Sequence, residues 1–159
     1  MVDKGFNPFA YPPMMLKFIF DLSGRHPFIL QGMLEYLWTD TPSEWDTLKI
    51  RNSSLKFIRE HGNNFQRWVG AFGMPEKAIY RTLAESSKSD MNVSDIRSSL
   101  DKNLRPESDD ALNILSYHGI IDTNDPSNPK VAGTLFRTWF IEHTLDYKPN
   151  EKLLKHGQF

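Results

Sequence analysis

The sequence predicts a mainly α-helical protein whose second half has the order helix, helix, helix, β-hairpin. Apolar helical spacing over residues 111–115 stops at His118-Gly119, where the glycine can adopt the left-handed conformation that ends a helix. Two short apolar runs, 120–121 and 130–132, then flank D-T-N-D-P-S-N-P, a composition that favours turns. This order is typical of a winged helix-turn-helix unit with a small β-hairpin wing.

The first half is predicted to form a helical subdomain over residues 14–72. Residues 1–13 contain a glycine and three prolines, which predicts an irregular aromatic segment, and its Phe6, Phe9 and Tyr11 are expected to pack on the following helices or on a portion outside this chain. Residues 14–22 form a short helix that is apolar on most faces, and Pro27 opens the next helix, 27–39.

An amphipathic helical stretch follows within residues 43–64, and helical spacing resumes at 65–72 after a break at Gly62-Asn63-Asn64. The residues in the first of these stretches expected to be buried are Trp45, Leu48, Leu55, Phe57 and Ile58.

The winged unit is predicted over residues 74–147. Its first helix spans 76–85, and Ser94 and Ser108 are the predicted N-caps of the second and third helices, because a serine hydroxyl can accept from an unpaired amide. A last helix covers 134–147, and the polar residues 148–159 are predicted to form a flexible tail.

The amino-acid composition excludes several classes of protein function. The chain has no cysteine, so disulfides, thiolate metal sites and cysteine nucleophiles are excluded. A net charge of -1 gives no global attraction to nucleic acid or to anionic membranes. No signal-peptide pattern or membrane span is present, which predicts a cytoplasmic setting. Neither a phosphate-binding loop nor a metal-binding histidine pair occurs, so we expect neither catalysis nor a metal site in this chain.

The residues of the third helix in the winged unit do not favour recognition of DNA. A recognition helix normally presents polar and basic side chains to the major groove. Residues 108–118 contain no Lys or Arg, and two aspartates at the start would repel phosphate. A packing or protein-contact role is therefore favoured over DNA binding, whose candidate contacts would be Lys102, Arg105, Asn113 and Lys130.

One short segment, Arg25-His26-Pro27, has a candidate chemical role, because it stands at a helix N-terminus where free amides favour anions. The alternative is a purely structural helix start. Two longer runs add to this segment: L-S-G-R-H-P-F-I-L-Q-G-M-L-E-Y-L-W resembles the "tGGHPyllQ…lw" signature in the helical lid of archaeal and bacterial AAA-like and STAND-type ATPases. The winged-helix domain after that lid is resembled by a second pair of runs, L-N-I-L-S-Y-H-G-I-I-D and then V-A-G-T-L-F-R-T-W-F.

The resemblance implies that residues 14–72 are lid-like and that a P-loop domain binding ATP or ADP would lie before residue 1. It assigns nucleotide sensing to Gly24, Arg25, His26 and Pro27, although Arg25 stands where the family usually has a second glycine. That departure either adds a phosphate-sensing charge or removes nucleotide contact.

The sequence hypothesis is a non-catalytic regulatory module that couples the nucleotide state of an upstream ATPase domain to partner or oligomer contacts. The main alternative is a winged-helix transcriptional regulator. A third, weaker alternative is a small catalytic domain that uses His26 and a nearby carboxylate.

Overall fold

Eight α-helices and one two-stranded antiparallel sheet make up the part of the chain that the computed structural model describes, residues 13–40, 47–86 and 91–143. The predicted N-terminal aromatic segment before residue 13, Trp45 and the predicted tail lie outside these residues. The elements in chain order are α1 (Pro13–Ser23), α2 (Pro27–Asp40), α3 (Thr47–Glu60), α4 (Gly62–Ala71), α5 (Met74–Glu85), α6 (Val93–Ser99), the 3-10 turn η2 (Arg105–Glu107), α7 (Ser108–Tyr117), β1 (Ile121–Asp122), β2 (Lys130–Val131) and α8 (Thr134–His143).

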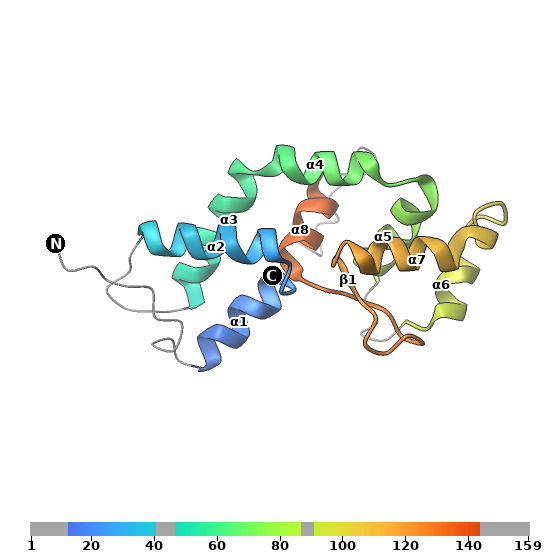
Figure 1. Ribbon diagram of the computed structural model, residues 1–159, viewed down its shortest axis with the longest axis horizontal. Helices are drawn as coiled ribbons and strands as arrows, with labels where there is room; N and C mark the ends of the chain where they lie inside the picture. The colour runs from blue at the N-terminus through green and yellow to red at the C-terminus, as the bar shows by residue number, and fades with distance from the viewer. Residues whose placement is uncertain (1–12, 41–46, 87–90, 144–159) are drawn as a thin grey trace.

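The first four helices form one group, on the left and upper sides of Figure 1. Within it α2 packs most extensively against α3. Gly32 makes this approach possible, since a Cβ there would lie 2.1 Å from the Phe57 ring. Phe57 also packs edge-on to Phe65, with ring centroids 6.2 Å apart. Aromatic rings therefore fill the space where a larger residue on α2 would not fit.

The second group consists of α5, α6, α7 and the hairpin, on the right of Figure 1. The hairpin pairs Ile121 with Val131 and Asp122 with Lys130. Side-chain oxygens of Asp122 and Asp125 accept from backbone amides in the polar tip, as expected for its turn composition. The tip is anchored to the start of α6, because the Val93 amide donates to the Ser127 carbonyl at 3.0 Å.

Helix α8 joins the two groups. It contacts α1 and α3 as well as α5, and lies between the groups in Figure 1. Phe136 is the central contact, with its ring 5.7 Å from that of Phe65 and 5.3 Å from that of Tyr80. The Arg137 Nε also donates to the Ala84 carbonyl at 2.8 Å, which fixes α8 against the end of α5.

Most predicted elements are present, with shifts at their ends. The break expected at residues 62–64 is at His61, and α4 begins at Gly62. Leu48 was predicted to be buried but is 62% exposed, because it lies on the outer face of α3, whereas Phe57 and Ile58 are buried as expected. The last helix is described to His143, and residues 144–147 lie outside the described chain.

Both predicted serine caps are wrong. Asn92 caps α6, its side chain accepting from the Asp95 amide at 2.8 Å, because the helix begins one residue before Ser94. Ser108 is itself the first residue of α7, since the η2 turn leads directly into the helix. Its buried hydroxyl instead accepts from Arg97 Nε at 3.2 Å.

Candidate functional site at the α1–α2 turn

The α1–α2 turn meets the end of the hairpin backbone to backbone. Gly24 has a left-handed φ of +62°, and a Cβ added to it would lie 2.5 Å from the Ala132 carbonyl carbon. A Cβ on Gly133 would in turn lie 2.5 Å from the Gly24 nitrogen. Both distances are far below any ordinary contact, so each glycine leaves the space that the other occupies. The two sequence runs that carry the family resemblance thus meet here.

Arg25 also has a positive φ, of +58°. This conformation costs a non-glycine residue about 1–2 kcal/mol, whereas glycine adopts it freely. The backbone at position 25 is therefore one that suits the glycine usual in the lid signature. The Arg25 amide donates to the Ser23 hydroxyl at 3.1 Å, and its exposed guanidinium lies over the Phe20 ring, 4.9 Å from the centroid.

His26 points inward from the same turn. Its ring packs on Trp68 of α4, with centroids 4.8 Å apart, and its Cδ2 lies beside Gly119 at the end of α7. The imidazole also donates to the backbone carbonyl of His118. The Nδ1 atom is buried and has no hydrogen-bond partner among the described residues. One histidine thus contacts α4 and the α7–hairpin junction together.

Burial lowers the pKa of His26 below its ordinary value. The hydrogen bond to the His118 carbonyl favours the charged form, but it does not offset the loss of solvent, and the nearby His118 ring lowers the pKa further. His26 is thereby favoured in its neutral form. No described carboxylate contributes to the shift, so the structure gives no support to an acid–base pair built on this residue.

The four nucleotide-sensing candidates thus divide into two pairs. Gly24 and His26 face the hairpin and α7, whereas Arg25 and Pro27 are exposed. An exposed cation beside the first turn of α2 is suited to meeting an anion. The inward pair is partly buried, and any displacement of the turn would act directly on residues 118–119 and 132–133 of the second group.

The DNA-binding candidates are not brought together in the same way. Arg105 donates to the carbonyls of Leu100 and Ser98, so its guanidinium is used in holding the end of α6. A cation that sequence reasoning did not single out, Arg97, pairs with Asp109 at 2.8 Å. Two of the arginines nearest to α7 are thus engaged within the protein.

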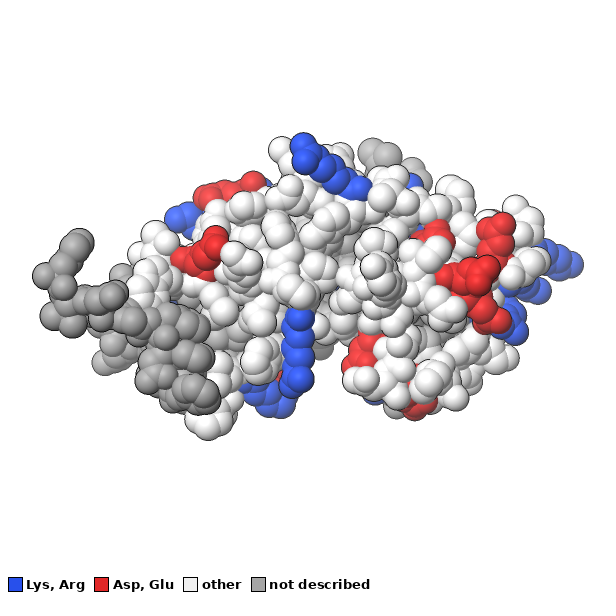
Figure 2. Space-filling view, in the orientation of Figure 1, with Lys and Arg blue, Asp and Glu red and all other residues white. Residues whose placement is uncertain are grey.

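The outward face of α7 is acidic and apolar. Asn113 is exposed there with Asp110, and Tyr117 on the same face is 89% exposed. Acidic atoms gather over the right-hand end of α7 in Figure 2, where its first turn lies. Lys102 and Lys130 are exposed, and Lys130 belongs to the hairpin that carries Asp125. Hydrogen bonds from the Asn128 side chain and the Ser127 amide lower the pKa of the Asp125 carboxyl, and the charge of Lys130 adds a smaller effect in the same direction. Asp125 is therefore favoured as an anion, and it lies near Lys130, which is the only Lys or Arg among the described hairpin residues.

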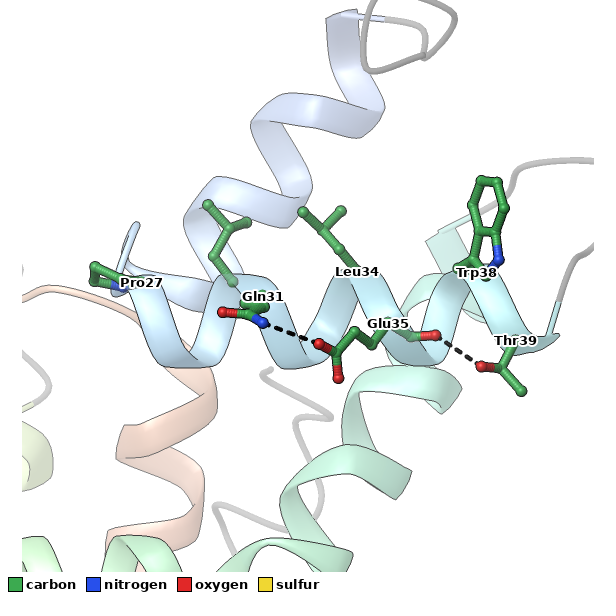
Figure 3. A pocket seen from close by; sticks show the side chains of 7 residues that line it. Pro27, Gln31, Leu34, Glu35, Trp38 and Thr39 are labelled. Carbon is green, nitrogen blue, oxygen red and sulfur yellow. Dashed lines mark hydrogen bonds between the residues drawn. The ribbon is translucent and has the colours of Figure 1, made fainter. Parts of the chain in front are cut away.

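A second surface continues from Pro27 along α2. It is a shallow groove of about 640 Å³. In Figure 3, Leu34 and Trp38 project to the same side of the helix, and Gln31 bonds to Glu35 beside them. Trp38 is 45% exposed, which is unusual for so large an apolar side chain. The turn is thus continuous with an apolar helix face.

Sequence reasoning missed three of the residues that complete this site, Trp68, Ala132 and Gly133. Trp68 lies in the helical stretch predicted at 65–72, and Gly133 lies in the second motif, but neither was assigned to the site. Gly24 and Gly133 could have indicated this contact, since a glycine outside a helix can mark a point where two backbone segments approach closely.

In the described ranges, no group of three or more His, Asp or Glu side chains is placed to hold a metal ion. Across the same residues, no helix has the length and apolar character needed to cross a bilayer.

Comparisons with protein-family models, with curated proteins and with solved structures found no match to this chain.

Proposed function

We propose that this chain is a non-catalytic regulatory module of the kind found in AAA-like and STAND-type ATPases, with α1–α4 as a helical lid and α5–α8 with the hairpin as a winged helix. Its task would be to pass the nucleotide state of a P-loop domain on to partner or oligomer contacts. The observation that carries the proposal is the backbone contact of Gly24 with Ala132 and Gly133.

In this proposal the direct contact between turn and hairpin passes movement from one group to the other. The turn has no flexible side chain between it and the hairpin at Gly24, so a shift of the turn cannot be absorbed by a change of rotamer. His26 adds a second contact, since its ring lies between Trp68 and Gly119. Movement of the turn would therefore displace both the hairpin and the end of α7. In this proposal Arg25 is the group that meets the nucleotide phosphates, and the α2 groove that starts at Pro27 faces the ATPase domain.

The test begins with the gene. The coding sequence before codon 1 and the neighbouring genes are read for G-x-x-x-x-G-K-[S/T]. The P-loop protein found there is combined with the chain, and hydrogen exchange is compared with ATP and with ADP. We expect exchange at residues 22–26 and 130–134 to change together, whereas the amides of residues 96–99 in α6, beyond the Val93 bond to the hairpin, serve as the control. A P-loop partner that binds the chain but leaves both segments unchanged would contradict the proposal.

The isolated chain provides a second test. We expect no saturable ATP binding with a Kd of about 1 μM or tighter by calorimetry, because the proposal places the main phosphate contacts in another domain. Such binding would show that this chain holds a nucleotide site of its own.

DNA binding remains the second candidate because of the order of α5, α6, α7 and the hairpin, with Asn113 exposed on α7. The pairing of Arg97 with Asp109 weighs against it. A selection from random duplexes tests it. Sequence-specific binding with steep salt dependence that Asn113→Ala relaxes would establish the regulator, and we expect none.

A further inference from the structure

A groove of about 680 Å³ lies between α4, α5, α8 and the turn at residues 99–104. It shares no lining residue with the α1–α2 turn, with the hairpin or with the α2 groove. This volume falls within the range of pockets that hold small molecules. The protein therefore contains a second concave surface that the proposed coupling does not use.

The groove has an apolar floor. Among its lining residues are Trp139 and Phe140 of α8, Ala78 of α5 and Leu100, of which all but Ala78 are buried. Met74, at the beginning of α5, is 69% exposed. A ligand with an apolar body would remove this surface from water, which favours binding once the costs of association are met.

Gly70 is the second observation that points to an occupant. It is the second-last residue of α4, where glycine favours the helix less than alanine does. A Cβ added to Gly70 would meet no heavy atom within 4 Å, in contrast to Gly24, Gly32 and Gly133. No contact among the described residues requires the missing side chain. Because Gly70 lines the groove, its bare backbone leaves room for a ligand to approach α4 closely.

Cations predominate on the groove's rim. Lys77 and Arg81 are one helical turn apart on the α5 face that also carries Ala78. Arg81 Nε forms an ion pair with Glu85 Oε1 at 3.5 Å, and Glu85 does not line the groove. His143 stacks on Trp139, and Asp101 is the single carboxylate among the described lining residues. The rim thus has a cationic side directly above an apolar floor.

We propose that this groove binds a small carboxylate with an apolar body, such as a medium-chain fatty acid or an aromatic acid. The body lies over Gly70 and Ala78, and the carboxylate meets Lys77 and Arg81. This site is independent of the nucleotide-coupling proposal, so either can fail alone.

The test is an NMR titration of the full chain with two probes, octanoate and 2-naphthoate, and with their neutral amides. We expect saturable one-to-one shifts centred on residues 69–70 and 77–82, with a Kd below about 1 mM for at least one acid. The acid that binds more tightly identifies the body as alkyl or aryl. The matching amide should bind about tenfold more weakly, because it lacks the charge-assisted contact. Absence of saturable shifts with both acids would overturn the proposal.

Gly70 also supplies a matched pair of variants. Gly70→Phe fills the groove, whereas Gly70→Ala adds one methyl group into open space and keeps the helix. We expect Gly70→Ala to bind within about threefold of the unmodified chain and Gly70→Phe to lose about tenfold or more. Equal binding by the two variants, with folded circular dichroism spectra for both, would place the probe elsewhere.

The charged rim is tested separately. Lys77→Glu should weaken acid binding about tenfold and leave amide binding unchanged, because it removes one cation and adds a repelling carboxylate. Arg59→Glu on α3 makes the same charge reversal on an exposed residue outside the groove. If Arg59→Glu weakened binding as much as Lys77→Glu, the interaction would be a general charge effect and the proposed site would be wrong.

Discussion

The two helix groups have cores of different composition. In α2–α4 aromatic rings face inward, with Phe57 packing edge-on to Phe65 and Phe65 edge-on to Trp68. The core of α5–α7 is aliphatic apart from Tyr80 in the described residues. Helix α8 belongs to the second group by sequence, yet Phe136 places its ring among the aromatic residues of the first. The helix that completes the core of the second group is therefore aromatic, like the core of the first group.

The turn residues before residue 74 divide the chain into two segments in sequence, but the side chains of the two segments pack together through α8. An aliphatic core of three short helices and a two-residue-strand hairpin is small, and domains of this size are marginal alone. Sharing α8 makes each group a part of the other's core. The contact of Gly24 with Gly133 at the start of α8 therefore lies where motion in one group reaches the other most directly.

The largest expected effect comes from breaking the shared helix. Phe136→Ala should destabilise the protein by about 4 kcal/mol, because it leaves a cavity between Phe65 and Tyr80. Urea unfolding followed by circular dichroism and by tryptophan fluorescence should show one transition shifted for both probes. Tyr117→Ala, which truncates an exposed ring, should change stability by less than about 0.5 kcal/mol. Separate transitions for the two probes would mean that the groups fold independently.

Gly133→Ala tests the junction alone. The added methyl would lie 2.5 Å from the Gly24 nitrogen, and backbone must shift to admit it. We expect a loss of about 3 kcal/mol in chemical denaturation. Gly70→Ala is the matched control, since it adds the same methyl into open space and should raise stability by about 0.5–1 kcal/mol. Similar values for both variants would show that the backbone contact is loose.

Arg25→Gly should act in the opposite direction. Glycine adopts the φ of +58° without strain, so we expect a gain of about 1 kcal/mol, part of it offset by the lost contact with Phe20. Thermal unfolding measures the change. A destabilised variant would mean that the guanidinium contributes more than the strained backbone costs.

Protonation of His26 should loosen the junction at low pH. Because burial lowers its folded pKa below the ordinary value of 6.5, the unfolded chain binds more protons in the interval between the two pKa values. The stabilising contribution is therefore complete above about pH 6.5 and is lost as the pH falls toward the folded pKa.

This effect is measured as the melting temperature between pH 7.5 and 5. His26→Phe, which keeps a ring against Trp68 but cannot be protonated, should remove part of the slope. His143→Gln is the control, because that histidine packs on Trp139 away from the turn. An unchanged slope in His26→Phe would assign the pH dependence to other groups.

The smallest effect is expected at the exposed pair of Arg97 and Asp109, which joins α6 to α7 within the second group. Its side chains are 46% and 73% exposed, so a double-mutant cycle to alanine should give a coupling energy of about 0.5 kcal/mol or less. High salt should reduce it further. A coupling well above 1 kcal/mol would show that the pair organises the second group.

Local chemistry in the sequence was sufficient for the hairpin and for most helices. Asp122 to Pro129 has the composition of a turn, and Gly119, with a φ of +72°, ends α7 where the glycine predicted it. These features depend on neighbouring residues, so they can be recognised without the rest of the chain. The serine caps failed because α6 begins early enough for Asn92, two positions before Ser94, to make the capping bond, and because the η2 turn runs directly into α7 at Ser108.

The candidate site was decided by the tertiary structure. The sequence identified residues 24–27 and the run around Gly133 as separate motifs more than a hundred positions apart, and their contact depends on how α8 packs against α1 and α5. In the same way, the inward direction of His26 and the open space at Gly70 follow from which helices lie opposite them. Motifs are local properties of the chain, whereas burial and proximity are produced by distant segments that the sequence pattern does not pair.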